Sequence, residues 1–338
     1  MIQYIIKRIG YILLVALILS LVLYLLYNCI PMDRAAMQLE GRKQQLMKDG
    51  IYEETYLALR KQMGLDEPLL KQYLYWMGLA PLNGKFNGIL QGNFGYSWKY
   101  KTAAVELFAE PMKNTVFLNF FATVLALGIT IPLGIFCAVK KGSGRDAAVQ
   151  TFSIIGYSLP TFIIAIVFIW LFAVLLKIFP VSGMGTPNTD YTGVRAFLDK
   201  LYYMALPLLI MTFASLGGMT RYVRSSMIEA LSMDCVRTAR AKGLKERTVV
   251  YSHAFRNALV PIITLVIGWF FGIFSGSVVV EQMFGLNGIG RLYIEALSGK
   301  DYEVAMALQM FYVFLGLLGN LTIDLAYGLV DPRVRVNR

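Results

Sequence analysis

The sequence predicts an all-α membrane protein with six transmembrane helices. Of its 338 residues, 57% are hydrophobic and only 16% are charged, whereas a soluble domain usually carries about 25% charged residues. The apolar residues also form long runs instead of recurring at helical spacing. A hydrocarbon core about 30 Å thick needs roughly 20 apolar residues per helix, and several runs reach that length. A soluble protein with a large core explains this pattern poorly.

The expected spans contain glycine and proline, which membrane helices tolerate better than soluble helices do. The fourth span is the weakest, because Pro207, Gly217 and Gly218 interrupt it. The six expected spans are residues 9–30, 114–139, 151–176, 202–220, 259–280 and 304–329.

The positive charge indicates the orientation, because lysine and arginine collect in short cytoplasmic loops. With the N-terminus inside, the inner pieces carry net charges of +2 at the N-terminus, +2 (140–150), +5 (221–258) and +2 at the C-terminal tail. The outer pieces carry +2 (31–113), +1 (177–201) and −2 (281–303). Both termini are therefore expected in the cytoplasm. A nucleic-acid-binding protein would gather its charge on one soluble surface, so nucleic acid is not an expected partner.

This topology divides the chain into three parts. Residues 1–30 form the N-terminal end and the first transmembrane helix, and residues 31–113 form an extracytoplasmic segment. Residues 114–338 form helices two to six, with a cytoplasmic loop at 221–258.

The extracytoplasmic segment is expected to be a small folded cap. We expect one or two helices within residues 34–64, a short helix over 69–76 after Pro68, and a glycine-rich loop over 84–97. The segment is too short for a full ligand-binding domain.

The residue inventory excludes most catalytic and metal chemistry. Cys29, Cys137 and Cys235 lie far apart without metal-ligand spacing, and His253 is the only histidine. The sequence lacks the G-x-x-x-x-G-K-[ST] phosphate loop and the H-E-x-x-H zinc motif. We therefore expect no catalytic residues, no cofactor, no metal and no ATP binding by this chain.

The cytoplasmic loop predicts a short basic helix. Asp234 can cap its N-terminus, Val236, Ala239 and Ala241 give it apolar contact surface, and Gly243 suits the left-handed residue that ends many helices. Such a helix could project toward a protein partner or lie on anionic lipid. The residues alone leave these two alternatives open.

The same loop resembles the EAA-type loop of ABC importer permeases. The run D-C-V-R-T-A-R-A-K-G at 234–243, followed by H-A-F-R-N-A at 253–258, is similar to the B-type subunit of the dipeptide/oligopeptide/nickel permease family. The resemblance covers nearly the whole chain. It continues at 63–68, 92–97, 114–115, 138–143, 157–162, 281–284, 288–291 and 331–333.

The chain departs from the family pattern at two motifs and in one longer segment. The family's P-G-D-P after the first helix is Pro31-Met32-Asp33-Arg34 here, and the tyrosine after the loop aspartate is Cys235. Residues 34–56 match no family motif.

The resemblance implies a type I ABC importer permease fold in a bacterial or archaeal cell membrane. It implies import of short peptides with a second homologous permease subunit, two cytoplasmic ATP-binding subunits and an extracytoplasmic substrate-binding lipoprotein; membrane lipid surrounds the helices. Nickel or another solute is the alternative cargo. The residues implied in ATPase coupling are Glu229, Asp234, Arg237, Thr238, Ala239, Arg240, Lys242, Gly243, His253, Arg256 and Asn257.

Two features inside the expected spans are candidates for packing or for the pathway. Gly268, Gly272 and Gly276 recur every four residues, a spacing that lets helix backbones approach closely. Asp324 is the only ionisable residue well inside an expected span, and such carboxylates are functional candidates. An ion pair with Arg333 or Arg335 is the favoured interpretation for it.

Two rival functions are less well supported. A self-sufficient secondary transporter would show internal repeats, broken helices and midplane charges. A membrane-embedded enzyme would need a nucleophile and a base brought together within the spans, and neither pattern is visible.

Overall fold

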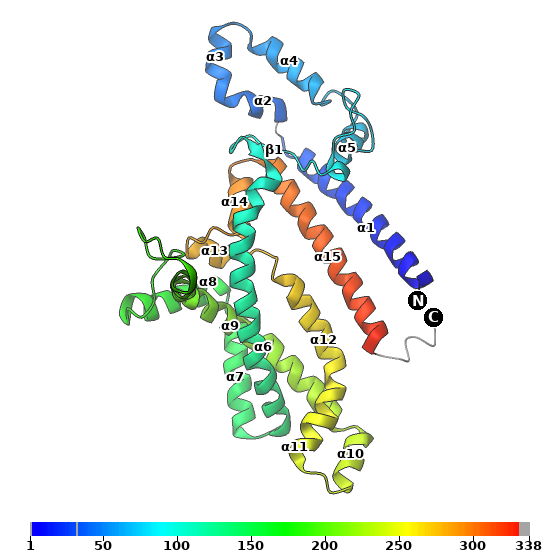
Figure 1. Ribbon diagram of the computed structural model, residues 1–338, viewed down its shortest axis with the longest axis vertical. Coiled ribbons are helices and arrows are strands. Elements are labelled where there is room, and N and C mark those ends of the chain that lie inside the picture. Colours follow the sequence, from blue (N-terminus) through cyan, green and yellow to red (C-terminus); the bar gives the residue numbers. More distant parts are fainter. Residues whose placement is uncertain (1, 32, 331–338) are drawn as a thin grey trace. The chain divides into compact units, whose positions relative to one another are not determined.

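The computed structural model describes residues 2–31 and 33–330 (Figure 1). It forms two compact units, Met1–Ala109 with Tyr293–Leu317 and Glu110–Leu292 with Leu318–Arg338. Within the described residues, five helices are long and apolar enough to cross a membrane, or six if one bent pair is counted as a span.

The first unit consists of a long apolar helix, a set of short elements and the first part of a second long helix. The two short strands pair antiparallel, with Tyr96 opposite Ala103 and Ser97 opposite Thr102. Its elements are α1 (Ile2–Asn28), α2 (Arg34–Leu39), η1 (Glu40–Arg42), α3 (Lys43–Lys48), α4 (Tyr52–Gln62), α5 (Leu69–Met77), η2 (Ile89–Gln91), β1 (Tyr96–Ser97), β2 (Thr102–Ala103), η3 (Ala104–Phe108) and parts of α14 (Ile289–Ser298) and α15 (Tyr302–Val330).

Helix α1 turns most of its apolar surface outward. Leu13 and Leu14 are 64% and 54% exposed, a surface suited to hydrocarbon and not to water. Its C-terminal part is buried by α5, since Tyr24 packs with Tyr73 and Met77 in a small core. The hydroxyls of Ser20 and Tyr73 are 2.8 Å apart. The predicted short helix over 69–76 is thus confirmed, and it packs on the first span.

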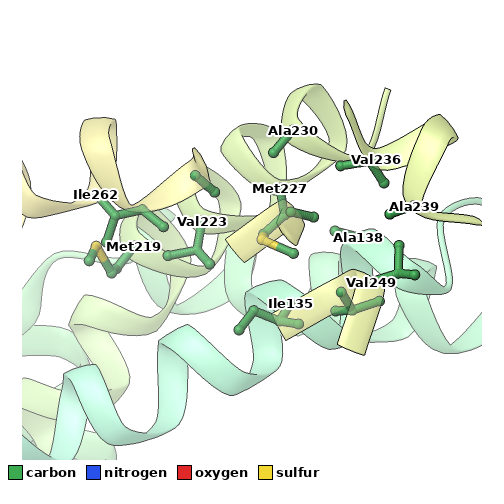
Figure 2. Close-up of a cluster of buried hydrophobic side chains, with 13 residues drawn as sticks. Ile135, Ala138, Met219, Val223, Met227, Ala230, Val236, Ala239, Val249 and Ile262 are labelled. Atoms are coloured by element: carbon green, nitrogen blue, oxygen red, sulfur yellow. The ribbon is translucent and has the colours of Figure 1, made fainter. Parts of the chain in front are cut away.

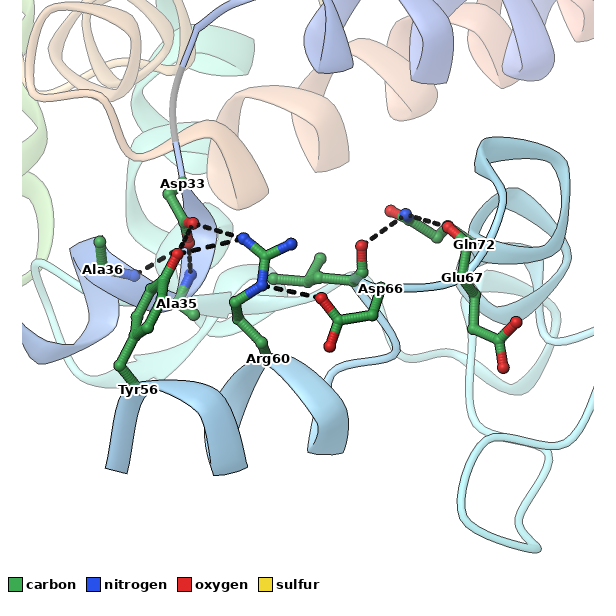
Figure 3. A network of polar contacts seen from close by, with 9 residues as sticks. Asp33, Ala35, Ala36, Tyr56, Arg60, Asp66, Glu67 and Gln72 are labelled. Atoms are coloured by element: carbon green, nitrogen blue, oxygen red, sulfur yellow. Dashed lines mark hydrogen bonds and ion pairs between the residues drawn. The ribbon is translucent and has the colours of Figure 1, made fainter. Parts of the chain in front are cut away.

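A carboxylate joins the short outer helices (Figure 3). Asp33 caps α2 by accepting hydrogen bonds from the backbone N–H groups of Ala35 and Ala36. Its other oxygen accepts hydrogen bonds from the Tyr56 hydroxyl and from Arg60 Nη1, the latter at 2.7 Å. Tyr56 and Arg60 belong to α4, so one side chain ties the start of the segment to its second half. Residues 34–64 form α2, η1, α3 and α4 instead of the expected one or two helices.

The second unit contains the remaining apolar helices. Its elements are most of α6 (Ala109–Val139), α7 (Gly144–Ser158), α8 (Thr161–Phe168), the π-helical turn η4 (Ile169–Leu175), α9 (Gly193–Leu231), α10 (Asp234–Ala241), α11 (Glu246–Thr248), the π-helical turn η5 (Val249–Ala254), α12 (Phe255–Gly272), α13 (Val278–Met283), the start of α14 and the end of α15.

The third expected span, residues 151–176, falls on a pair of helices that is bent and not straight. Helices α7 and α8 meet at a bend of 104°. Pro160 lacks an N–H and restricts the residue before it to extended backbone, and Leu159 has φ −84° and ψ 134°. The bend therefore follows from the proline.

The fourth and fifth spans differ from expectation in length. Helix α9 runs for 39 residues straight through Pro207, Gly217 and Gly218, because neighbouring helices support it. Close approach of α7 explains why residue 217 is a glycine, because a Cβ there would lie 2.3 Å from the Ser153 carbonyl oxygen. Helix α12 ends at Gly272, eight residues before the predicted end at 280.

The Asp33 network predicts a pH-dependent contribution to stability. Burial would raise the pKa of Asp33, but the hydrogen bonds from Tyr56 and the α2 amides, together with Arg60, lower it below its ordinary value of 3.8. A lowered carboxyl pKa contributes stability above that value, and the contribution is lost as the pH falls through the lowered pKa. We expect Asp33→Asn to destabilise the outer segment by about 1–2 kcal/mol at neutral pH.

Hydrogen exchange of the α2 and α4 amides in the purified chain would measure this cost. The matched control is Asp49→Asn, at an exposed aspartate that ends α3. Equal protection of α4 in wild type and Asp33→Asn would contradict the role assigned to Asp33.

Candidate functional site

The predicted coupling helix is α10, and its N-terminus differs from expectation in one respect. Met233 occupies the N-cap position with extended backbone, φ −66° and ψ 147°, so the prediction that Asp234 caps the helix is wrong. Asp234 lies one residue later, in the first turn, where the positive end of the helix dipole stabilises its negative charge. Its carboxylate is 3.4 Å from Arg237 Nη1, and both side chains are largely exposed.

The C-terminal stop of α10 is confirmed. Gly243 has φ +74°, and its N–H donates to the Arg240 carbonyl at 2.9 Å. Among the described residues, no heavy atom lies within 4 Å of a Cβ placed on Gly243. The requirement for glycine here is therefore the left-handed backbone and not the available space.

One face of α10 is buried against other helices of the second unit, to which α10 itself belongs (Figure 2). Val236 and Ala239 are 0% and 5% exposed and belong to a core cluster, whereas Ala241, also predicted as contact surface, is exposed. The short helix thus packs through two small side chains on α9 and η5, within a cluster to which α6 and α12 also contribute. The cluster also contains Ile135 and Ala138 of α6, Met219, Val223, Met227 and Ala230 of α9, Val249, Val250 and Ala254 of η5, and Ala258 and Ile262 of α12.

The opposite face of α10 and the residues after it are basic and exposed. Arg240 makes a bidentate contact with Glu246 at 2.7 and 3.2 Å, which joins the end of α10 to α11. The other exposed cations of this surface are Arg237, Lys242, Lys245 and Arg247. This basic surface is suited to an acidic protein partner or to anionic lipid.

The remaining residues implied in coupling lie around α10. Asn257 Nδ2 is 3.6 Å from Cys235 Sγ and donates to the His253 carbonyl at 2.8 Å, so Asn257 links α12 to α10. Thr238 Oγ1 donates back to the Asp234 carbonyl at 2.9 Å. Glu229, on α9, and Arg256, on α12, are exposed and His253 is half-buried.

An ion pair that sequence reasoning missed lies near this surface. Arg224 of α9 binds both oxygens of Asp146 at 2.7 and 2.8 Å, and the side chain of Asp146 is only 5% exposed. The Gly142 N–H also donates to Asp146 at 3.0 Å. The two residues are 78 positions apart in the sequence. The charge pattern places each of them in a cytoplasmic loop, and no sequence motif indicates that they form an ion pair.

The predicted glycine stripe is only partly present. Gly268 and Gly272 lie on α12, line a cavity of about 280 Å³ with Asn119 and Trp269, and have no atom of the described chain near an added Cβ. Gly276 lies beyond the end of α12, and a Cβ there would be 2.2 Å from the Gly290 nitrogen. All three glycines line this cavity, and Gly276 is also required by the close approach of the Gly290 backbone.

A polar network beside this cavity was not predicted. Glu281 is 1% exposed and accepts hydrogen bonds from the Thr115 hydroxyl at 2.8 Å, the Ser277 N–H at 3.1 Å and the Arg291 N–H at 2.9 Å. A Cβ on Gly288 would stand 2.3 Å from the Glu281 Cδ. The motif residues 114–115, 281 and 288–291 are thus one structural unit.

Asp324 lies on α15 and is half-buried. Its expected partners Arg333 and Arg335, and the motif at 331–333, lie outside the described residues. The ion pair stays a prediction.

Two family profiles match the chain. The profile described as "Binding-protein-dependent transport system inner membrane component" matches residues 130–336. A second, "Binding-prot-dependent transport system membrane comp, N-term", matches residues 1–119.

Curated relatives match over the full length. The oligopeptide transport system permease protein AppB of Bacillus subtilis is 34% identical, with 99% of each chain covered. The dipeptide transport system permease protein DppB of Escherichia coli is 32% identical, with 99% of each chain covered. A putative peptide permease protein of Brucella ovis is 37% identical over 82% of this chain and 84% of its own.

One similar solved structure is an inward-facing form of the MetNI methionine ABC transporter. The TM-score is 0.53 at 17% identity, over 67% of this chain and 97% of the matched chain. This likeness concerns the fold, which is that of a type I ABC importer permease.

Proposed function

Because the chain belongs to the family of binding-protein-dependent transport system inner membrane components, we propose that it is a translocation subunit of an ATP-driven importer of short peptides. The observation that supports a peptide cargo is full-length similarity to permeases named for oligopeptides and dipeptides. Family membership implies partnership with ATPase subunits and a binding protein. We propose two ATPase subunits, a second homologous permease and a lipid-anchored binding protein.

We propose that α10 transmits ATPase closure to the membrane helices. Its buried face contacts α9 and η5, which pack with α6 and α12 in the same cluster, so a displacement of α10 would reach the membrane helices through this core. Its exposed basic face is suited to an acidic groove. The rival interpretation, anchoring on lipid, uses the same charges and differs in which partner they bind.

The cavity beside α12 is proposed as part of the translocation pathway. Gly268, Gly272, Ser275 and Ser277 give its wall small side chains, which would impose little side-chain selectivity on a peptide. Such a wall would leave specificity largely to the binding protein.

The charge asymmetry supports an orientation with both termini in the cytoplasm of a bacterial or archaeal cell. We expect Asp49→Cys, in the outer segment, to react with an impermeant thiol reagent on intact cells, and Lys245→Cys to react only after permeabilisation. Cys29 and Cys235 are exposed, so both variants belong in a background without native cysteines. The reverse labelling pattern would contradict the six-span topology.

Deletion of the gene should abolish uptake of some short peptides while free amino-acid uptake continues. The measurement is radiolabelled dipeptide and tripeptide uptake in a strain without a redundant system, with rescue by the wild-type gene. Unchanged peptide uptake would overturn the peptide assignment, and nickel or another solute would then be tested in the same strain.

Gly243→Val should uncouple transport from ATP hydrolysis. Valine in the left-handed region costs roughly 1–2 kcal/mol, which is enough to misplace α10 without preventing membrane insertion. Gly243→Asn is the matched control, because asparagine tolerates this backbone conformation. We expect transport to fall much further than expression for Gly243→Val and to stay near wild type for Gly243→Asn.

Charge reversal separates the coupling and lipid interpretations. If α10 binds the ATPase, Arg240→Glu should weaken ATPase co-purification and make it more sensitive to salt. Intact co-purification with normal substrate-stimulated ATP hydrolysis in both Arg240→Glu and Gly243→Val would refute the coupling role.

A further inference from the structure

The first unit contains a cavity that the transport mechanism above does not use. Its volume is about 520 Å³, within the range of pockets that bind small molecules. The short outer helices, the loop around β1 and the start of α15 line it, and all lining residues belong to the first unit. It is therefore a candidate binding site in the outer part of this chain.

The lining combines aromatic rings with charges of both signs. Trp76 and Trp98 give it flat apolar surface. Arg34 and Glu303 face each other with 3.8 Å between nitrogen and oxygen, and their side chains are 22% and 25% exposed. This separation is longer than a hydrogen bond, so each group keeps capacity to bind a ligand. Lys85 is a further cation in the lining.

Contacts of the residues just before Glu303 help to hold this side of the cavity in shape. The Ser97 hydroxyl donates to buried Asp301, and Trp98 Nε1 donates to the Lys300 carbonyl at 3.3 Å. A Cβ on Gly95 would stand 2.5 Å from the Glu303 carboxylate, so glycine at 95 leaves the space that this side chain occupies. The position of Glu303 is thus fixed by its neighbours in the fold.

We infer that this cavity binds a short zwitterionic peptide, an inference that rests on the proposed function. The ammonium group of the peptide pairs with Glu303, and its carboxylate pairs with Arg34 or Lys85. Its apolar side chains pack on Trp76 and Trp98, where aromatic surface contributes most of the contact area. A purely anionic ligand would be opposed by Glu303, and an uncharged ligand would form no ionic contact with either charge.

Calorimetric titration of the purified full-length chain with L-alanyl-L-phenylalanine, in the absence of any binding protein, tests the inference. We expect saturable binding by the wild type and at least a tenfold weaker affinity for Glu303→Gln, because an ionic hydrogen bond is lost. The matched control is Glu53→Gln at an exposed carboxylate on α4, which should bind like the wild type.

A modified ligand keeps the test independent of variant folding. N-acetyl-L-alanyl-L-phenylalanine amide lacks both terminal charges and should bind the wild type at least tenfold more weakly. Equal affinity for the two peptides, unchanged binding by Glu303→Gln, or no saturable binding by the wild type would overturn the inference.

The two proposals fail in different ways. Absence of binding by the purified chain, with peptide uptake lost in the deletion strain, overturns the cavity assignment and leaves the importer function intact. Binding that depends on Glu303, with peptide uptake unchanged in the deletion strain, supports the cavity and overturns the importer function.

Discussion

The requirement that backbone polar groups be hydrogen-bonded inside a bilayer governs where this chain can depart from a helix. Helix α12 ends at Gly272, and the backbone stays irregular until α13 begins at Val278. Side chains of α6 supply the missing partners: Asn119 Nδ2 donates to the carbonyls of Ile273 and Ser275 at 3.0 and 2.6 Å. An irregular segment among apolar helices is stable here because a neighbouring helix completes its hydrogen bonds.

The same helix supports the next irregular turn. Asn114 Nδ2 donates to the Asn287 carbonyl at 2.9 Å, and Thr115 Oγ1 accepts from the Ile289 N–H at 2.9 Å. Glu281 completes the network from within the segment. Polar residues on an apolar helix are costly in hydrocarbon, so three of them within two turns of α6 are explained by the backbone that they satisfy. The cavity lined by Gly268 and Gly272 lies beside this network, with Asn119, Ser275 and Ser277 in its wall.

At the proposed coupling surface, small apolar side chains and charged side chains lie on two different faces of one short helix. The small buried pair Val236 and Ala239 (Figure 2) lets α10 lie close to α9 and η5. The cations of α10 stay exposed. The bidentate pair between Arg240 and Glu246 closes the turn after Gly243. A helix of eight residues has little stability alone, so its rigidity comes from this packing and from its two ends.

Several features could be predicted from the sequence alone, because they depend on residues close together in the chain. Apolar run lengths gave the membrane class, and five of the six expected spans overlap long helices within the described residues. Gly243 could be identified as a helix stop because a positive φ is a property of one residue. The family motifs indicated the proposed coupling loop for the same reason, since they are contiguous in the chain.

Tertiary structure alone decided the features that depend on distant partners. Helix α9 continues to Leu231, and the N-cap of α10 follows at Met233. Gly276 is not on the same helix as Gly268, because α12 ends at Gly272 and Asn119 accommodates the carbonyls that follow. Asp146 pairs with Arg224, and Arg34 faces Glu303, across 78 and 269 residues of sequence. Propensity and hydropathy act over a few turns, whereas a buried charge or a freed carbonyl is satisfied by whichever side chain the fold brings to it.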